Sequence, residues 1–201
     1  QAMQAGEWDI IILQQQSARS RYYDTYQPYL DNLLAELLKA RPGVTPAWLM
    51  TQAYGTGYDR LGDMHTDEMW ARISMASQQV MEKTPTRLLI PAGTAIQNAR
   101  YTALDRFGKA GHLVYDGYHL HEGIAPLIEG LCAAQVVMKH YGVDVDVEKS
   151  RLRITPEWRK ERRTPEPHGE PEPATEEDYS LAYRSVKWAL ASPWQLTVIE
   201  K

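Results

Sequence analysis

The sequence predicts an α/β fold, a doubly wound three-layer α/β/α arrangement built on a parallel sheet. Three short apolar runs have strand character, and they alternate with longer segments of helical periodicity: residues 8–13, 46–50 and 86–90. Alternation of this kind is typical of parallel sheets with helices on both faces. Polar residues follow each run, so we expect them to meet at the carboxyl edge of the sheet, where open α/β sheets bind ligands.

The first run, Trp8–Leu13, reads W-D-I-I-I-L and predicts a strand that is buried on both faces. Asp24 or Thr25 can cap the helix that follows, and Pro42-Gly43 ends it. The apolar face of that helix consists of Leu30, Leu33, Leu34, Leu37 and Leu38.

Further helices are predicted over residues 66–83, in the segment after Ile90, and over residues 124–141, where Gly142 closes the helix. Gly55–Asp63 contains three glycines and is expected to be a loop at the ligand end of the sheet. A last strand-like run, 111–115, leads into the loop that carries Asp116.

Three strands are fewer than a small doubly wound domain usually has, since an order such as 2-1-3-4-5 needs five. The chain begins with Gln1 rather than Met and enters a strand-like run almost at once. We therefore expect the missing strands to precede Gln1. The strand at residues 8–13 would then be an open edge, which predicts pairing with a missing segment or a partner chain.

The composition divides the chain into three parts. Residues 1–150 form the predicted α/β domain, and residues 151–174 are rich in Pro and Glu, as expected of an extended linker. Residues 175–201 are a predicted helix and tail, opened by a capping box at Thr175-Glu176-Glu177-Asp178.

Charge and composition exclude several classes of function. The net charge of −4 gives no support to nucleic-acid binding. No apolar run approaches the roughly 18 residues of a membrane span. Cys132 is the only cysteine, and neither a zinc-ligand pair nor a glycine-rich phosphate loop occurs. The sequence therefore predicts no metal and no cofactor.

Asp116 and His119 are the candidate catalytic pair, in the stretch L-V-Y-D-G-Y-H-L-H-E-G. At this spacing the carboxylate can orient the imidazole of a serine hydrolase, and the imidazole can act as general base. The alternative is that Asp116 caps the next helix and His119 is an ordinary loop histidine. Further polar residues at predicted strand ends are candidate substrate or oxyanion contacts: Gln14, Gln16, Ser17, Gln52, Tyr54, Thr94 and Gln97.

Three segments resemble a bacterial subfamily of the SGNH (GDSL-type) hydrolases, which have a flavodoxin-like sheet. They are L-Q-Q-Q-S at residues 13–17, I-P-A-G-T-A-I-Q-N-A-R at 90–100 and D-G-Y-H-L-H-E-G at 116–123. The resemblance implies that Asp116 and His119 are the family's catalytic Asp-x-x-His pair.

The family's G-D-S or G-N-S nucleophile motif does not occur here, so the serine is expected upstream of Gln1. Glutamines occupy the stretch where the family has G-x-N-D, so Gln14 or Gln16 would replace the oxyanion-hole Asn. Ser17 lacks glycine neighbours and is predicted to be a polar loop residue or a substrate contact.

The resemblance implies a Ser-His-Asp ester hydrolase acting on acyl or acetyl esters, with a small molecule or glycan ester as substrate and a secreted or periplasmic location. The alternative is a non-catalytic, SGNH-like module that binds carbohydrate or serves as a structural scaffold. Its support is the aromatic composition, 12 Tyr and 6 Trp against a single Phe.

Overall fold

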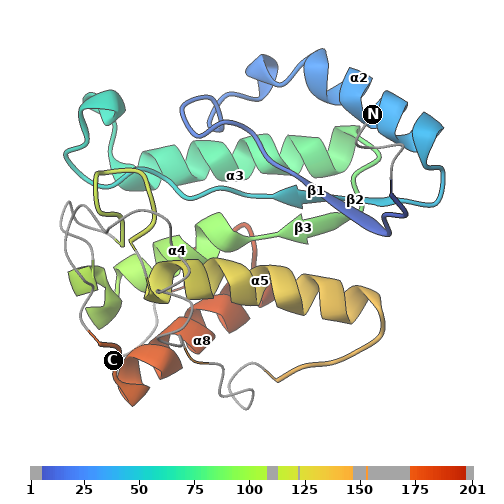
Figure 1. Cartoon of the computed structure of the whole chain (residues 1–201). Coiled ribbons are helices and arrows are strands. Elements are labelled where there is room, and N and C mark those ends of the chain that lie inside the picture. Colours follow the sequence, from blue (N-terminus) through green and yellow to red (C-terminus); the bar gives the residue numbers. More distant parts are fainter. Residues whose placement is uncertain (1–5, 108–112, 122, 147–152, 154–172, 198–201) are drawn as a thin grey trace.

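The computed structural model describes residues 6–107, 113–121, 123–146, 153 and 173–197. Three strands form one parallel sheet in the order β1-β2-β3 (Figure 1): β1 (Ile10–Leu13), β2 (Thr45–Leu49) and β3 (Leu88–Ile90). The three predicted strands are therefore confirmed, with small shifts at their ends. Because the strands are parallel, their carboxyl ends lie at one edge of the sheet.

Helices cover both faces of the sheet. Figure 1 shows α2 (Tyr29–Ala40) and α3 (Thr66–Lys83) on one face. The other face carries α4 (Ala92–Arg100), α5 (Ile124–His140) and α8 (Glu176–Ala191). The molecule thus has the predicted three-layer α/β/α fold, and short 3-10 turns lie in the connecting segments at residues 23–25, 59–61 and 103–107.

Each face of the sheet has its own hydrophobic core. Leu34, Leu37 and Trp48 are buried between α2, α3 and β2. On the other face, buried residues of α4, α5 and α8 form one cluster with Ile90. A third cluster, which includes Met50, Tyr54 and Met69, lies beyond the carboxyl end of β2. The loops at that end of the sheet therefore rest on packed side chains.

The expected burial of β1 on both faces is wrong. None of its four residues is fully buried, and the side chain of Ile12 is 47% exposed. The reason is its position, because β1 pairs only with β2 in the described structure and its other edge is open. An edge strand has a neighbour on one side only, so helices cover it incompletely.

The expected start of the second helix at Asp24 or Thr25 is also wrong. Asp24 and Thr25 belong to a 3-10 turn, and α2 begins only at Tyr29, after Pro28. The Thr25 hydroxyl donates to the carbonyl of Tyr22 at 2.7 Å instead of capping a helix. Local hydrogen bonds of this kind are a common alternative for threonine.

The C-terminal helix starts as predicted. Thr175 accepts a hydrogen bond from the Asp178 amide, and the Asp178 carboxylate accepts one from the Thr175 amide. Asp178 also forms a 2.5 Å ion pair with Arg106, which joins α8 to the preceding 3-10 turn. The predicted linker lies outside the described residues, apart from Arg153, Pro173 and Ala174.

Within the described residues, no helix has both the length and the apolarity needed to cross a membrane.

Candidate active site

The loop from Leu113 to His121 carries the predicted catalytic pair. Its two arms are joined by an isolated antiparallel bridge between Val114 and Leu120, and the Tyr115 amide donates to the His119 carbonyl at 3.1 Å. The loop is thus a small closed hairpin rather than a fourth strand of the sheet. Of the predicted strand-like run at 111–115, residues 111 and 112 lie outside the described residues.

Asp116 accepts three hydrogen bonds inside this loop. Its Oδ1 accepts from the backbone amides of Tyr118, at 3.1 Å, and His119, at 2.8 Å. Its Oδ2 lies 2.6 Å from Nδ1 of His119. One carboxylate therefore shapes the turn and orients the imidazole, and the expected contact between the two side chains is confirmed.

Protonation of the pair follows from the surroundings of Asp116. Partial burial raises the pKa of this carboxyl, but the hydrogen bonds from His119 and Tyr118 outweigh that effect and hold it below its ordinary value. The carboxylate is therefore ionised at neutral pH and can only accept. Nδ1 of His119 must then carry a hydrogen, and in the neutral form of the imidazole the lone pair is on Nε2.

The imidazole is open to solvent while its partner is more enclosed. The side chain of His119 is 50% exposed and that of Asp116 is 28% exposed. The ring of His119 contacts two tyrosines, with centroids 3.7 Å from Tyr118 and 5.6 Å from Tyr115. This arrangement limits rotation of the imidazole and leaves Nε2 free to act on another molecule.

The loop after β2 holds the Asp116 loop in place. The Gln52 side chain donates to the Tyr118 carbonyl at 2.8 Å, and the Gly55 amide donates to the Gly117 carbonyl at 2.7 Å. Gly117 has a φ of 97°, and a Cβ there would lie 2.3 Å from the Tyr58 ring. Only glycine allows so close a contact at that conformation. Gln52 therefore lies at the predicted site, as a support for the loop.

Tyrosine rings line the same region. Tyr54 contacts Tyr58 and Tyr118 edge-on, with centroids 5.0 Å and 5.8 Å apart. Tyr54 is almost fully buried, whereas Tyr58 and Tyr118 are half-buried. The Tyr54 hydroxyl donates to Oγ of Ser17 at 3.3 Å. Tyr54 thus connects the segment after β1 with the loop that carries His119.

Gln14, Gln16 and Ser17 follow β1 at the same edge of the sheet. Gln14 and Gln16 are exposed, and within the described structure their side-chain amides make no hydrogen bond, which leaves these amides available as donors. Ser17 is half-buried against Tyr54.

Thr94 and Gln97 lie inside the protein, in α4. Thr94 is fully buried, and its hydroxyl donates to the Pro193 carbonyl at 2.6 Å. Gln97 is 2% exposed, and its amide donates to the Asp67 carboxylate at 2.6 Å. In the described structure both side chains bond to other parts of the protein, Thr94 to the segment after α8 and Gln97 to α3. We expected both as substrate contacts, and the contacts found here are structural.

Arg100 is a supporting residue that sequence reasoning did not single out. It is buried in α4 and donates to the Gln97 side chain at 2.6 Å and to the Ala53 carbonyl at 2.7 Å. Burial lowers its pKa to about 10, so the guanidinium keeps its charge at neutral pH. It holds the backbone between Gln52 and Tyr54. The sequence feature that could have identified Arg100 is its position as the last residue of the segment I-P-A-G-T-A-I-Q-N-A-R.

No group of three or more His, Cys, Asp or Glu side chains in the described part of the chain is arranged to hold a metal ion. At the Asp116 loop, Asp116 and His119 can form hydrogen bonds and transfer protons, and the exposed side-chain amides of Gln14 and Gln16 lie at the same edge of the sheet.

Comparisons with known proteins give the family and the fold. The solved structure of a DUF4886 family protein from Bacteroides uniformis is similar to this chain, with a TM-score of 0.76 and 22% identity over 98% of this chain and 68% of that one. At this identity the likeness supports the fold alone. No curated protein matches the chain. The sequence model described as "Domain of unknown function (DUF4886)" matches residues 1–151, which include Asp116 and His119. The chain therefore belongs to the DUF4886 family.

Proposed function

We propose that this chain carries the base and the orienting acid of an SGNH-type serine ester hydrolase. The supporting observation is the 2.6 Å contact between Nδ1 of His119 and Oδ2 of Asp116, with the imidazole half exposed. In a Ser-His-Asp enzyme the base needs this tautomer and this orientation. A loop histidine without a catalytic role needs neither a fixed tautomer nor a fixed ring orientation.

In the proposed reaction, Nε2 of His119 takes the proton of a serine hydroxyl as the serine oxygen attacks the ester carbonyl. The same nitrogen then returns the proton to the departing alcohol, and an acyl-enzyme remains. Water, activated in turn by His119, hydrolyses that acyl-enzyme. Asp116 stays ionised and stabilises the imidazolium. The side-chain amide of Gln14 or Gln16 would donate to the oxyanion.

The nucleophile would come from polypeptide that pairs with the open edge of β1. A strand parallel to β1 would end at the edge of the sheet where Gln14 and the His119 loop lie. A serine directly after such a strand would lie on the correct side of the molecule. Ser17 remains the alternative, but its Oγ contacts Tyr54, and no hydrogen bond joins it to His119 in the described structure.

The proposed substrates are acyl or acetyl esters, including esters of carbohydrates. A second candidate function, glycan binding without cleavage, is favoured by the half-buried rings of Tyr115 and Tyr118, which contact His119, and of Tyr58, which contacts Tyr118. Exposed aromatic faces can stack on sugar rings as well as on a leaving group.

The test is turnover of p-nitrophenyl acetate and labelling by a fluorophosphonate. Residues 1–201 alone are expected to show weak turnover and no stoichiometric labelling. A longer form that includes any coding sequence before Gln1 is expected to be active and to lose about 10⁴-fold in kcat when His119 is replaced by Ala. His140→Ala, an exposed histidine at the far end of α5, is the matched control.

Stoichiometric labelling of Ser17, with turnover abolished in Ser17→Ala, would make Ser17 the nucleophile. Saturable glycan binding by a protein that never turns over esters, in either form, would favour the binding module instead.

A further inference from the structure

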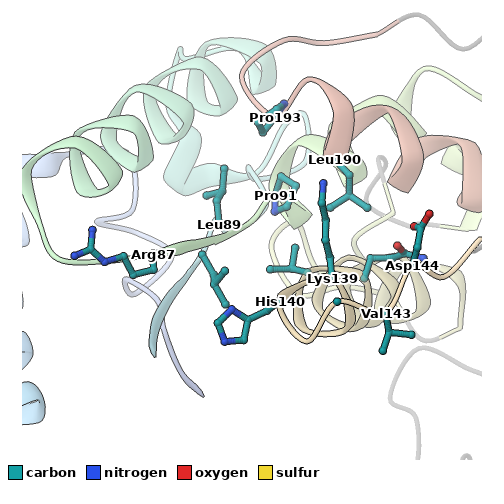
Figure 2. A pocket seen from close by; sticks show the side chains of 13 residues that line it. Arg87, Leu89, Pro91, Lys139, His140, Val143, Asp144, Leu190 and Pro193 are labelled. Atoms are coloured by element: carbon teal, nitrogen blue, oxygen red, sulfur yellow. The ribbon is translucent and has the colours of Figure 1, made fainter. Parts of the chain in front are cut away.

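A cavity of about 760 Å³ lies beside β3, away from the candidate active site (Figure 2). Its walls are the outer edge of β3, the last turns of α5, the turn that follows α5, and the end of α8. The volume falls within the roughly 300–1,000 Å³ that is typical of small-molecule sites. The apolar part of its lining consists of Leu88, Leu89, Pro91, Val136, Val143, Leu190 and Pro193.

The position of the cavity follows from the open edge of β3. Within the described residues β3 pairs only with β2, so no further strand fills the space beside it.

Helix α5 spans 17 residues from Ile124 to His140. At about 1.5 Å per residue its length is about 25 Å. The His119 loop precedes its first turn, so the cavity and the candidate active site lie at opposite ends of α5.

The turn after α5 gives the cavity a fixed wall. The Gly142 amide donates to the Lys139 carbonyl at 3.0 Å, and the Val143 amide donates to the Met138 carbonyl at 2.9 Å, with Gly142 at a φ of 74°. This is a Schellman ending, which satisfies the last carbonyls of the helix. The Gln135 side chain also donates to the Val145 carbonyl. The last carbonyls of the helix therefore accept hydrogen bonds from the turn itself, and the side chains of Lys139 and His140 are not needed to cap them.

The polar groups at the cavity are mainly basic. Arg87, Lys139 and His140 belong to its lining, and Asp144 is the carboxylate among the lining residues. In the described part of the chain, neither the Arg87 nor the Lys139 side chain forms an ion pair or hydrogen bond. Figure 2 shows Lys139 extending from α5 toward Leu190, while Arg87 and Asp144 lie at opposite ends of the view. This basic group occurs in a chain whose net charge is −4.

We propose that this cavity binds an amphipathic anion, a molecule with an acyl chain and a carboxylate head. The acyl chain would lie against Leu88, Pro91 and Val136, and the carboxylate would lie near Lys139, with Arg87 adding a second positive charge at the far side of the cavity. Apolar surface supplies the driving force and the two cations select the sign of the head group. The site is separate from the His119 loop, so the proposal stands independently of ester hydrolysis.

The probe is dodecanoate, kept below its micelle concentration, with dodecyltrimethylammonium as the matched cation of the same chain length. Calorimetry on the full 201-residue chain is expected to show saturable binding of dodecanoate at least about tenfold tighter than the cation. Lys139→Glu and Arg87→Glu are each expected to weaken dodecanoate binding about tenfold. Lys39→Glu, in the last turn of α2, is the control that places the same charge change at another helix end.

Methyl NMR locates the site independently of these variants. Dodecanoate should shift the methyl signals of Leu88, Val136 and Leu190 and leave those of Leu34 and Leu37, on the opposite face of the sheet, unchanged. Equal affinity for both probes, equal effects of Lys139→Glu and Lys39→Glu, or shifts confined to the opposite face would overturn the proposal. Co-sedimentation with phosphatidylglycerol vesicles without binding of free dodecanoate would also overturn it, in favour of a membrane surface.

Discussion

The side-chain amide of Gln52 donates a 2.8 Å hydrogen bond to the backbone carbonyl of Tyr118, 66 residues further along the chain. This contact joins the end of β2 to the loop that presents Asp116 and His119. The loop closes on itself through local bonds, but its position relative to the sheet depends on Gln52 and on the Gly55–Gly117 contact. The orientation of the candidate pair is therefore a property of the sheet edge as well as of the loop.

Gln52→Ala is expected to loosen the Asp116 loop without unfolding the protein. A hydrogen bond of this type contributes about 1 kcal/mol net, so amide exchange at residues 117–119 should become about fivefold faster. Hydrogen exchange followed by NMR measures this change. Gln79→Ala, which removes a glutamine that contacts Lys83 on the exposed side of α3, should leave those amides unchanged. Unaltered exchange in Gln52→Ala would show that the loop is positioned without Gln52.

Asp116→Asn is expected to destabilise the loop above pH 5 by about 1 kcal/mol, because Asn cannot accept from Nδ1–H and both backbone amides as a carboxylate does. Since the pKa of Asp116 is lowered from its ordinary value of 3.8, its stabilisation is present above that value. The stabilisation is lost as pH falls through the lower, folded-state pKa.

The difference in unfolding free energy between wild type and Asp116→Asn should therefore be constant from about pH 5 to 7 and shrink below about pH 4. Urea unfolding at a series of pH values measures it. A difference that grows as the solution is acidified would contradict the sign assigned here.

Gly93→Ala is expected to be strongly destabilising. A Cβ at Gly93 would lie 2.2 Å from the Thr51 carbonyl oxygen, which is backbone and cannot move aside alone. Forced repacking of this kind costs about 1–3 kcal/mol. Gly130→Ala in α5 is the matched control, because nothing lies within 4 Å of its added Cβ. It should stabilise α5 by up to about 1 kcal/mol. Thermal unfolding of both variants tests whether the close approach of α4 to the backbone after β2 is the reason that position 93 requires glycine.

The open edge of β1 is expected to cause association of this chain. Four apolar residues on and around that edge are exposed: Trp8, Ile12, Tyr29 and Leu33. Uncovered strand edges with apolar neighbours tend to pair with other chains. Sedimentation velocity should show concentration-dependent association that Ile12→Lys reduces and Met75→Lys, at an exposed site on α3, does not. A monodisperse monomer at high concentration would contradict this expectation.

Local sequence was sufficient to predict the elements that depend on neighbouring residues. The three strands, the capping box at Thr175 and the end of α5 at Gly142 each follow from a few consecutive side chains. Asp116 and His119 belong to the same class, because a carboxylate three residues before a histidine can accept from its backbone and its ring within one turn. Local geometry alone brings this pair together.

Only the tertiary structure decided which polar residues face solvent. Thr94 and Gln97 resemble site residues in the sequence because they follow a strand, yet Thr94 is bonded to Pro193, 99 positions away, and Gln97 to Asp67, 30 positions away. The role of Arg100 depends equally on distant partners, since it donates to Ala53, 47 residues earlier. Burial is the sum of such long-range contacts, and a pattern of neighbouring residues cannot contain them. The sequence alone therefore determined the order of strands and helices and the Asp116–His119 contact, whereas packing decided which of the other candidates support the site from inside.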